Sequence, residues 1–321
     1  MKAVVLEKTC KANELKVSEV EKPKVRDNWV LVKVLGFGIN RAEVILRDYE
    51  ADEDYINLPI IPGIECMGEI INPSNTDFKK GEKVIGLMGG MGRSFNGSYA
   101  EYVLLPSKNV FEIPYVTFNY LTLDEIIAIP ETYFTAFGSV EALKITEKDT
   151  VLIRGATSSL GLTAIQLIKA IGAKVIATTR DENKFLKLKN NGADECIVDN
   201  GQLSNKINCS KVLELIGPKT LEDSMKCLNK GICCVTGVLG EVEYMDYFDP
   251  IKIIPNECYL TSFFSNYPTQ KTINNLFNFI IKNNIKPAIA KTFTNLEDIG
   301  EAHKLMESNK SCGKIIFKLE K

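Results

Sequence analysis

The chain has 321 residues, a charged fraction of 25% and a formal net charge of −2, which suits about two domains of ordinary globular composition. Proteins that bind nucleic-acid phosphates usually carry a strongly basic surface, so this charge argues against that class. No uninterrupted apolar run approaches the roughly 18 residues of a membrane span, so we expect no membrane partner.

The first 120 residues are typical of short strands separated by turns. Strands are predicted at residues 2–6, 29–35, 67–71, 83–87 and 99–105. Glycine and proline fall between these segments, where the chain must reverse its direction. Many short strands with such turns predict a β-barrel or a sandwich.

Beyond about residue 123 the pattern changes to strands that alternate with helices. The expected strands are residues 150–154, 174–178, 196–198, 212–216, 232–236 and 259–264, and the expected helices are residues 159–171, 181–190 and 218–228. This alternation predicts a parallel sheet with helices on both faces. The last 30 or so residues predict a strand, a helix and a final strand over 314–319.

The sharpest functional signal lies between the strand at 150–154 and the helix that follows it. The segment reads Gly155, Ala156, Thr157, Ser158, Ser159, Leu160 and Gly161. Small residues at a helix N-terminus let a dinucleotide pyrophosphate approach the backbone amides, so we predict that residues 156–161 bind a cofactor. The match to G-x-G-x-x-G is incomplete because Ala156 and Ser158 replace two glycines. A tight turn in another α/β protein is therefore the alternative interpretation.

The end of the next strand bears on the choice of cofactor. It offers Thr179 and Arg180, with Lys184 one helical turn further on. Cations and hydroxyl donors suit a 2′-phosphate, so these residues favour NADPH over NADH. Asp181 is the counter-argument, because a carboxylate there suits an unphosphorylated ribose. A solvated pair formed by Arg180 and Lys184 is a further alternative.

His303 is the only histidine of the chain. A single histidine argues against a Ser-His-Asp triad and excludes any site with two histidine ligands. We predict a structural or solvent-facing role for it, in an ordinary helix over residues 296–306. The nine cysteines are an odd, scattered number, which is typical of reduced thiols, and residues 1–11 lack a signal-peptide pattern. Both observations predict a cytoplasmic protein.

Seven motifs in a fixed order carry a resemblance to a known family. They are M-K-A-V-V at 1–5, F-G-I-N-R-A-E at 37–43, P-G-I-E-C-M-G at 62–68, G-E-K-V at 81–84, G-S-Y-A-E-Y at 97–102, T-A at 135–136 and G-K-I at 313–315. Together they resemble the medium-chain dehydrogenase/reductase superfamily, and within it the zinc-free quinone oxidoreductases related to zeta-crystallin. The resemblance covers essentially the whole chain.

This resemblance implies an α/β fold with two domains. Residues 1–123 and 287–321 would form a GroES-like β-barrel domain. Residues 124–286 would form a Rossmann domain, a doubly wound parallel sheet that binds NADP, with the active site in the cleft between the domains. The resemblance also implies a homodimer that pairs the strand at 259–264 with its mate, because this apolar strand would otherwise remain an open edge.

The resemblance also implies site residues. The candidate catalytic residues are Asn40, Arg47 and Tyr49, with Tyr55 and Arg93 as weaker candidates. The further cofactor-binding residues would be Thr135, Gly217, Gly237, Val238, Leu239, Phe263, Phe264 and Lys314. Zinc-dependent relatives carry cysteine near Gly38 and Ile39, and a His-Glu pair where this chain has Ile64 and Glu65. No metal is therefore expected, and Glu65 would be a structural hydrogen-bond acceptor.

The implied activity is hydride transfer from NADPH to a small-molecule quinone. The nicotinamide supplies the hydride, while donors near the acceptor oxygen stabilise the charge that develops on it. An NADPH-dependent 2-alkenal or enone reductase is an alternative, because the same kind of site serves both substrates. A low-turnover NADPH-binding regulatory protein is another, although the acidic pI argues against binding RNA.

Overall fold

The computed structural model describes residues 1–242 and 244–319, and it divides the chain into two compact units. The barrel unit comprises Met1–Phe134 and Asn266–Lys321, and the sheet unit comprises Thr135–Ser265. The predicted combination of a GroES-like domain with a parallel-sheet domain is confirmed. Within the residues described, no helix is long and apolar enough to cross a membrane.

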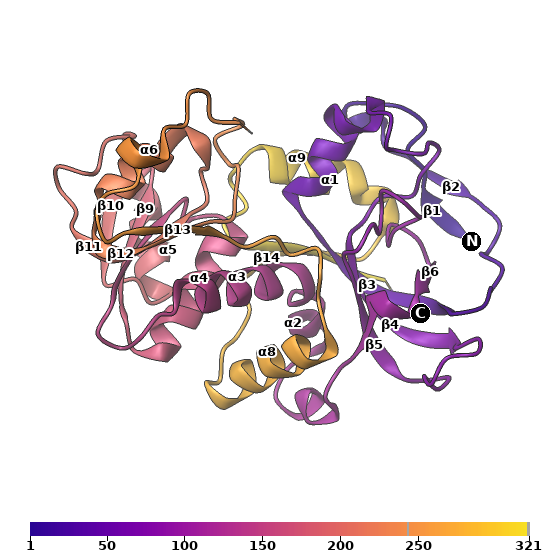
Figure 1. Ribbon diagram of the computed structural model, residues 1–321. Coiled ribbons are helices and arrows are strands. Elements are labelled where there is room, and N and C mark those ends of the chain that lie inside the picture. The colour runs from indigo at the N-terminus through magenta and orange to yellow at the C-terminus, as the bar shows by residue number, and fades with distance from the viewer. Residues whose placement is uncertain (243, 320–321) are drawn as a thin grey trace. The chain divides into compact units, whose positions relative to one another are not determined.

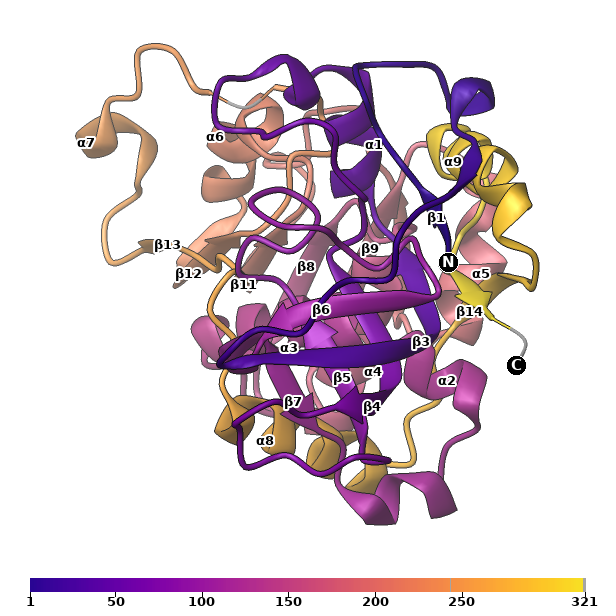
Figure 2. The same ribbon diagram turned by 90° about the vertical axis from the view of Figure 1, so that its right-hand side faces the viewer.

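The barrel unit is built on a mixed sheet in the order β14-β15-β3-β4-β5-β7, with β6 also paired to β3. Its strands are β3 (Trp29–Ile39), β4 (Glu65–Asn72), β5 (Lys83–Leu87), β6 (Tyr102–Pro106), β7 (Val110–Glu112), β14 (Ile289–Phe293) and β15 (Lys314–Lys318), and β1 (Lys2–Val4) pairs separately with β2 (Val17–Glu19). Figure 2 shows β3 to β7 side by side. The long strand β3 holds the core together, because Phe37 stacks on both Tyr99 and Phe317.

Helices and single turns close the barrel unit. They are α1 (Arg41–Asp48), α2 (Leu123–Ile127), α8 (Gln270–Lys282) and α9 (Ile299–Glu307), with 3-10 turns η1 (Ala12–Glu14), η2 (Glu50–Asp52), η3 (Ser107–Asn109), η4 (Tyr115–Asn119) and η6 (Leu296–Asp298). Antiparallel pairing joins β15 to β3 in the register Ile315 opposite Ile39. The C-terminal strand is thereby built into the sheet formed by the N-terminal strands, and this places Lys314 beside the end of β3.

The sheet unit is a parallel sheet in the order β10-β9-β8-β11-β12-β13. Its strands are β8 (Thr150–Arg154), β9 (Lys174–Thr179), β10 (Glu195–Val198), β11 (Cys209–Glu214), β12 (Leu228–Val235) and β13 (Tyr259–Ser262). Its helices are α4 (Ser159–Ile171), α5 (Phe185–Asn190), α6 (Pro218–Lys226) and α7 (Pro250–Ile253), together with the 3-10 turn η5 (Glu182–Lys184) and the end of α3 (Pro130–Leu143). In Figure 1, α6 lies on one side of the strands, with α3 and α4 on the other. This order, 3-2-1-4-5-6 along the chain, is that of a dinucleotide-binding sheet, with its switch point between β8 and β11.

The boundaries between the units differ from the predicted ones at 123/124 and 286/287. Residues 124–134 and 266–286 lie in the barrel unit instead. The side chain of Ile127 in α2 packs against Gly36 of β3. Gln270 of α8 accepts a hydrogen bond from the backbone N–H of Glu112 at 2.8 Å and donates one to its carbonyl at 3.0 Å. Both helices therefore belong to the unit whose strands they cover.

His303 is buried in α9 of the barrel unit. Its Nε2 atom lies 3.1 Å from the Tyr99 hydroxyl, and burial lowers its pKa to about 3. The side chain is therefore neutral at physiological pH. The predicted structural role is confirmed, and the solvent-facing alternative is wrong.

Candidate functional site

The turn between β8 and α4 has the shape of an anion-binding helix N-terminus. Gly155 adopts φ +78°, a conformation that favours glycine, and a Cβ on Gly161 would lie 2.6 Å from the Ala156 Cα atom. Both glycines therefore let the turn close tightly. The first-turn amides of α4 have no acceptor further back in the helix, and those that Ser158 does not cap can bind a phosphate.

Ser158 shapes this turn from within. Its hydroxyl accepts a hydrogen bond from the Gly161 N–H at 3.0 Å and donates one to the Gly155 carbonyl at 2.9 Å. It is thus the N-cap of α4. The Ser158 hydroxyl is therefore already used within the turn.

The end of β9 carries the residues predicted to contact the 2′-substituent of the ribose. Thr179 is buried, Arg180 is exposed and Lys184 is half-buried. Asp181 uses one carboxylate oxygen to accept from both the N–H and the Nδ2 of Asn183, at 3.0 and 2.9 Å. The Asp181 carboxylate, which would suit an unphosphorylated ribose, therefore already caps the N-terminus of η5.

The ends of β11 and β12 complete the same edge of the sheet. Gly217 adopts φ +91°, and its N–H donates to Glu214 at 3.0 Å. A Cβ on Gly237 would lie 2.5 Å from the Leu215 carbonyl oxygen, and the Leu239 N–H donates to that oxygen at 3.0 Å. Because parallel strands end at one edge, the structure brings residues 156–161, 179–180, 217 and 237–239 to the same edge.

Three other predicted cofactor residues lie elsewhere in the sheet unit. The Thr135 carbonyl accepts from the Ser139 hydroxyl at 2.7 Å, one turn along α3. Phe263 packs its ring against Gly138 of the same helix, where a Cβ would overlap the ring. Phe264 is exposed.

Lys314 is the centre of a buried polar cluster in the barrel unit. Its ammonium donates to Asn40 Oδ1 at 2.6 Å, to Glu65 Oε1 at 2.6 Å and to Thr132 Oγ1 at 2.8 Å. The second Glu65 oxygen accepts from the Glu131 N–H at 2.7 Å. Glu65 is fully buried and Lys314 almost so. The predicted acceptor role of Glu65 is confirmed, with an ammonium as its partner.

Asn40 and Glu43 join this cluster from the start of α1. Asn40 Nδ2 donates to Glu65 Oε1 at 2.9 Å, while its Oδ1 accepts from Lys314. Glu43 accepts from the N–H groups of Asn40 and Ile64, at 2.7 and 3.0 Å. Both ends of the Asn40 amide are thus used within the cluster.

Glu43 was not among the predicted site residues, although its spacing from Asn40 is that of a capping box. Burial and then the charge of Glu65 raise its pKa to about 7, against the opposing effect of Lys314. Two buried carboxylates therefore face one ammonium, and the excess negative charge favours a proton on Glu43 near neutral pH.

Gly38 is required for the cluster to close. A Cβ at this position would overlap both Glu65 Oε1 and the Lys314 side chain. The absence of a side chain on β3 thus lets the carboxylate and the ammonium meet. Any larger residue at position 38 would force them apart.

The other predicted catalytic residues have partners of their own. Arg47 is buried, donates to the Cys10 carbonyl at 2.7 Å and pairs with Glu307 of α9, so it links α1 to that helix. Arg93 forms a two-pronged contact with Glu50, at 2.8 and 2.6 Å. The Tyr55 hydroxyl donates to Glu50 at 3.0 Å, and Tyr49 is half-exposed. None of these side chains forms a hydrogen bond with Lys314 or Glu65 among the contacts described.

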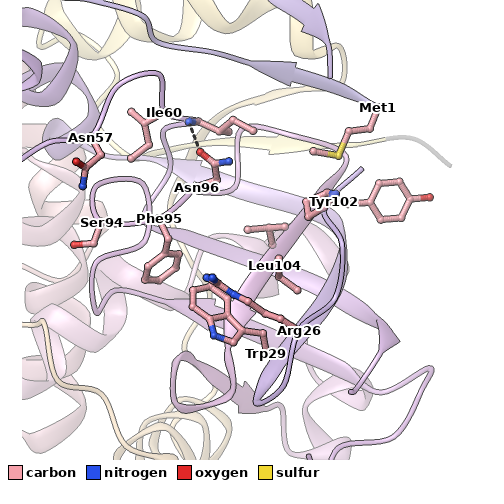
Figure 3. A pocket seen from close by; sticks show the side chains of 13 residues that line it. Met1, Arg26, Trp29, Asn57, Ile60, Ser94, Phe95, Asn96, Tyr102 and Leu104 are labelled. Atoms are coloured by element: carbon pink, nitrogen blue, oxygen red, sulfur yellow. Dashed lines mark hydrogen bonds between the residues drawn. The ribbon is translucent and has the colours of Figure 1, made fainter. Parts of the chain in front are cut away.

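A groove of about 250 Å³ lies in the barrel unit, apart from this cluster (Figure 3). Arg26 lies over the Trp29 ring at 3.5 Å, and Trp29 meets Phe95 edge to face at 5.3 Å. The residues that line the groove include neither a predicted site residue nor a member of the Lys314 cluster.

Comparison with known families agrees with this architecture. Residues 26–115 match the alcohol dehydrogenase GroES-like domain, and residues 191–317 match the zinc-binding dehydrogenase domain. The chain belongs to the medium-chain dehydrogenase/reductase superfamily. Within this superfamily it is 29% identical to the human quinone oxidoreductase over 64% of its own length and 59% of that protein, which is under two thirds of the relative. It is also 26% identical to the acryloyl-coenzyme A reductase of Sulfurisphaera tokodaii, over 94% of this chain and 96% of that one.

Solved structures of this superfamily share the fold. The quinone oxidoreductase from Coxiella burnetii aligns with a TM-score of 0.85 at 23% identity, covering 100% of this chain and 99% of the other. The yhdH oxidoreductase from Salmonella enterica, in complex with NADP, aligns with a TM-score of 0.84 at 20% identity, covering 100% of both chains. At these identities the likeness concerns the fold.

One family description names zinc, and the residues of this chain do not fit such an ion. Zinc sites use cysteine, neutral histidine and carboxylate ligands. Glu65 is already bound by the Lys314 ammonium, and His303 is bound to Tyr99. Across residues 1–242 and 244–319, no three His, Cys, Asp or Glu side chains are placed to hold a metal.

Proposed function

We propose that this chain is an NADPH-dependent oxidoreductase that transfers hydride to a quinone without a metal ion. The observation that carries the proposal is the turn between β8 and α4, at the switch point of a dinucleotide-binding sheet. The similarity to the human quinone oxidoreductase supports the acceptor. The engaged carboxylate of Asp181 and the exposed guanidinium of Arg180 support NADPH over NADH.

In this proposal the two units have separate tasks. The turn at residues 156–161 holds the pyrophosphate at the N-terminus of α4, and Thr179, Arg180 and Lys184 hold the 2′-phosphate. The bound nicotinamide supplies the hydride. In the barrel unit, the Lys314 ammonium is a fixed positive charge in a water-poor interior, and Glu43 retains a proton near neutral pH.

The nine cysteines are free, which supports a cytoplasmic location.

A second candidate is the reduction of an α,β-unsaturated carbonyl compound. The similarity to an acryloyl-coenzyme A reductase, which covers nearly the whole of both chains, favours it. Quinones and activated alkenes are both electrophilic enough to accept hydride once their carbonyl oxygen is polarised. The two candidates therefore share a cofactor and differ only in the acceptor.

The test is the loss of NADPH absorbance with 1,4-benzoquinone, 9,10-phenanthrenequinone and a 2-alkenal in parallel, with NADH as the control cofactor. Elemental analysis of protein purified without chelator measures zinc in the same sample. Turnover of quinones with NADPH and no stoichiometric zinc would support the first candidate, while preference for the alkenal would support the second. Tight NADPH binding without turnover would point to the regulatory alternative, and stoichiometric zinc would contradict metal-independent transfer.

We expect Arg180→Ala to weaken NADPH binding by about tenfold, because a hydrogen bond to a charged group contributes on the order of 1.5 kcal/mol. NADH binding should stay within about twofold. Titration of each cofactor measures both dissociation constants. Lys187→Ala, an exposed cation further along the same segment, should leave both unchanged. Equal losses for the two cofactors would show that the 2′-phosphate binds elsewhere.

We also propose that the chain forms a homodimer through β13, which is at the end of the described strand order. Figure 2 shows α7 extending away from the rest of the sheet unit. Ile251 of α7 is 91% exposed, and Tyr259 of β13 is 68% exposed. Sedimentation velocity should give twice the chain mass, and Ile251→Asp with Tyr259→Lys should give the monomer. Tyr115→Ser, an exposed aromatic of the barrel unit, should stay dimeric; a monomeric wild-type chain would contradict the proposal.

A further inference from the structure

Arg154 is a buried cation at the edge where the parallel strands of the sheet unit end. It lies directly before the turn between β8 and α4, which is called the cofactor turn below. It is the last residue of β8, and its side chain is fully buried. Its Nε and Nη2 atoms donate to the two carboxylate oxygens of Asp199, at 2.9 and 2.7 Å. Its Nη1 atom donates to Asp223 at 2.8 Å and to the Ser224 hydroxyl at 3.1 Å.

The two aspartates in turn hold the segment that follows β10. Asp199 accepts from the Gly201 N–H at 2.9 Å. Asp223, on α6, accepts from the N–H groups of Leu203 and Ser204, at 2.8 and 3.2 Å. Arg154 thus joins the end of β8 to residues 199–204 and to α6.

Glu214 extends this network to the end of β11. It is buried, and it accepts from the Ile216 and Gly217 N–H groups at 2.7 and 3.0 Å. It also accepts from the hydroxyls of Thr220 and Ser224. Because Ser224 also accepts from Arg154, the turns after β8, β10 and β11 are joined by one set of hydrogen bonds.

Thr178 links this network to the cofactor turn. Its hydroxyl donates to Asp199 at 3.2 Å and accepts from the Gly155 N–H at 3.4 Å. Its carbonyl accepts from the Ala156 N–H at 3.2 Å. The backbone of the turn is therefore fixed from two sides, through Arg154 itself and through the Asp199–Thr178 contact.

The charges of the network favour a permanently ionised centre. Burial alone would lower the pKa of Arg154, but its hydrogen bonds with Asp199 raise it above the usual range. Burial alone would raise the pKa of Asp199, and the same contact lowers it. A planar guanidinium satisfies this two-pronged geometry, whereas an ammonium is a single point of charge.

We propose that Arg154 is a positioning residue for cofactor binding, which orients the turn at 155–158 through Asp199 and Thr178. This inference rests on the proposed function, because it needs a nicotinamide cofactor at that turn. The ordering of the turns before binding lowers the entropy lost when the cofactor binds. The affinity for the cofactor therefore depends on a side chain that is fully buried.

The test is direct titration of NADPH and NADH into the wild-type chain and two conservative variants, Arg154→Lys and Asp199→Asn. Both variants keep a polar group of similar size at the altered position, and circular dichroism verifies that they are folded. We expect both cofactors to bind about 10- to 100-fold more weakly. The kcat at saturating cofactor should stay within about twofold of the wild type, because a positioning defect in binding raises KM.

The matched control is Lys169→Met. Lys169 pairs with Asp194 at 2.9 Å in the same unit, near the other end of α4, and its loss should leave both dissociation constants unchanged. Wild-type affinity in both variants, or a loss that only follows the unfolded fraction, would overturn the positioning role while the proposed function stands. A wild-type chain that binds neither cofactor would overturn the proposed function and this inference together.

Discussion

Lys314→Met should lower the free energy of unfolding by about 3–5 kcal/mol, which is the usual cost of removing one partner of a buried ion pair. The variant leaves Glu65 as a buried carboxylate without its ammonium. It also removes the donor to Asn40 Oδ1 and Thr132 Oγ1, which lie 2.6 and 2.8 Å from Nζ. Trp29 is the only tryptophan and lies in the barrel unit, so urea unfolding followed by its fluorescence measures the loss in that unit.

Two further variants make this measurement specific. Lys318→Met removes a lysine of the same strand that pairs with Asp124 at 2.6 Å but is 41% exposed, so its cost should stay below about 1 kcal/mol. Lys314→Met combined with Glu65→Gln should recover much of the loss, because the unpaired charge is gone. Equal costs for the two lysines would contradict the importance of the buried pair.

Glu43→Gln should change how stability depends on pH. The pKa of Glu43 is about 7 in the folded chain, against an ordinary value of 4.5. Between these pH values the folded chain keeps a proton on Glu43 that the unfolded chain has lost, so the contribution of this group to the free energy of unfolding falls as pH rises. The fall is about 3 kcal/mol. Glu43→Gln lacks this fall. The free energy of unfolding of the variant, relative to that of the wild type, should therefore rise by about 3 kcal/mol between pH 4.5 and 7.

His303 has the opposite effect in the same unit. Its pKa is about 3 in the folded chain, against an ordinary value of 6.5. Between these values the unfolded chain binds a proton that the folded chain does not, so this group lowers stability as pH falls. From pH 4.5 to 6.5 the two groups therefore give slopes of opposite sign, which largely offset each other in the wild type. His303→Gln should remove the second slope and leave that of Glu43.

The measurement for both variants is the urea unfolding curve of Trp29 fluorescence at pH values from 4.5 to 7. Glu53→Gln, an exposed carboxyl of the barrel unit, should follow the wild type throughout. A Glu43→Gln curve parallel to that of the wild type would show that Glu43 is ionised across this range in the folded chain.

The sequence predicted the sheet unit more completely than the barrel unit. The turn between β8 and α4 is a local signal, because the strand, the small residues and the amphipathic helix are contiguous. The order of the parallel strands then places residues 179, 217 and 237 at the same edge. Arg154 was absent from the predicted site, since an arginine at a strand end carries no signal of its buried partners.

The polar cluster of the barrel unit could be predicted only in part. Asn40 and Glu65 stood out by motif, but Lys314 is 249 positions from Glu65 in the chain and was predicted to bind the cofactor. The antiparallel pairing of both β15 and β4 with β3 brings the three together. Arg47 stood out by the same motif reasoning, yet the structure shows it linking two helices. Motif position does not determine the direction of a side chain.

Gly38 and Lys314 also constrain how this protein can diverge. A methyl group on Gly38 would overlap the Lys314 side chain and Glu65, so neither a cysteine nor an alanine fits there while the lysine remains. A change at position 38 must follow, or accompany, the loss of the lysine. The two positions should therefore covary among homologues, with glycine at 38 accompanying lysine at 314. Comparing positions 38 and 314 together across homologues would separate chains with a buried lysine ammonium from chains in which another cation occupies that space.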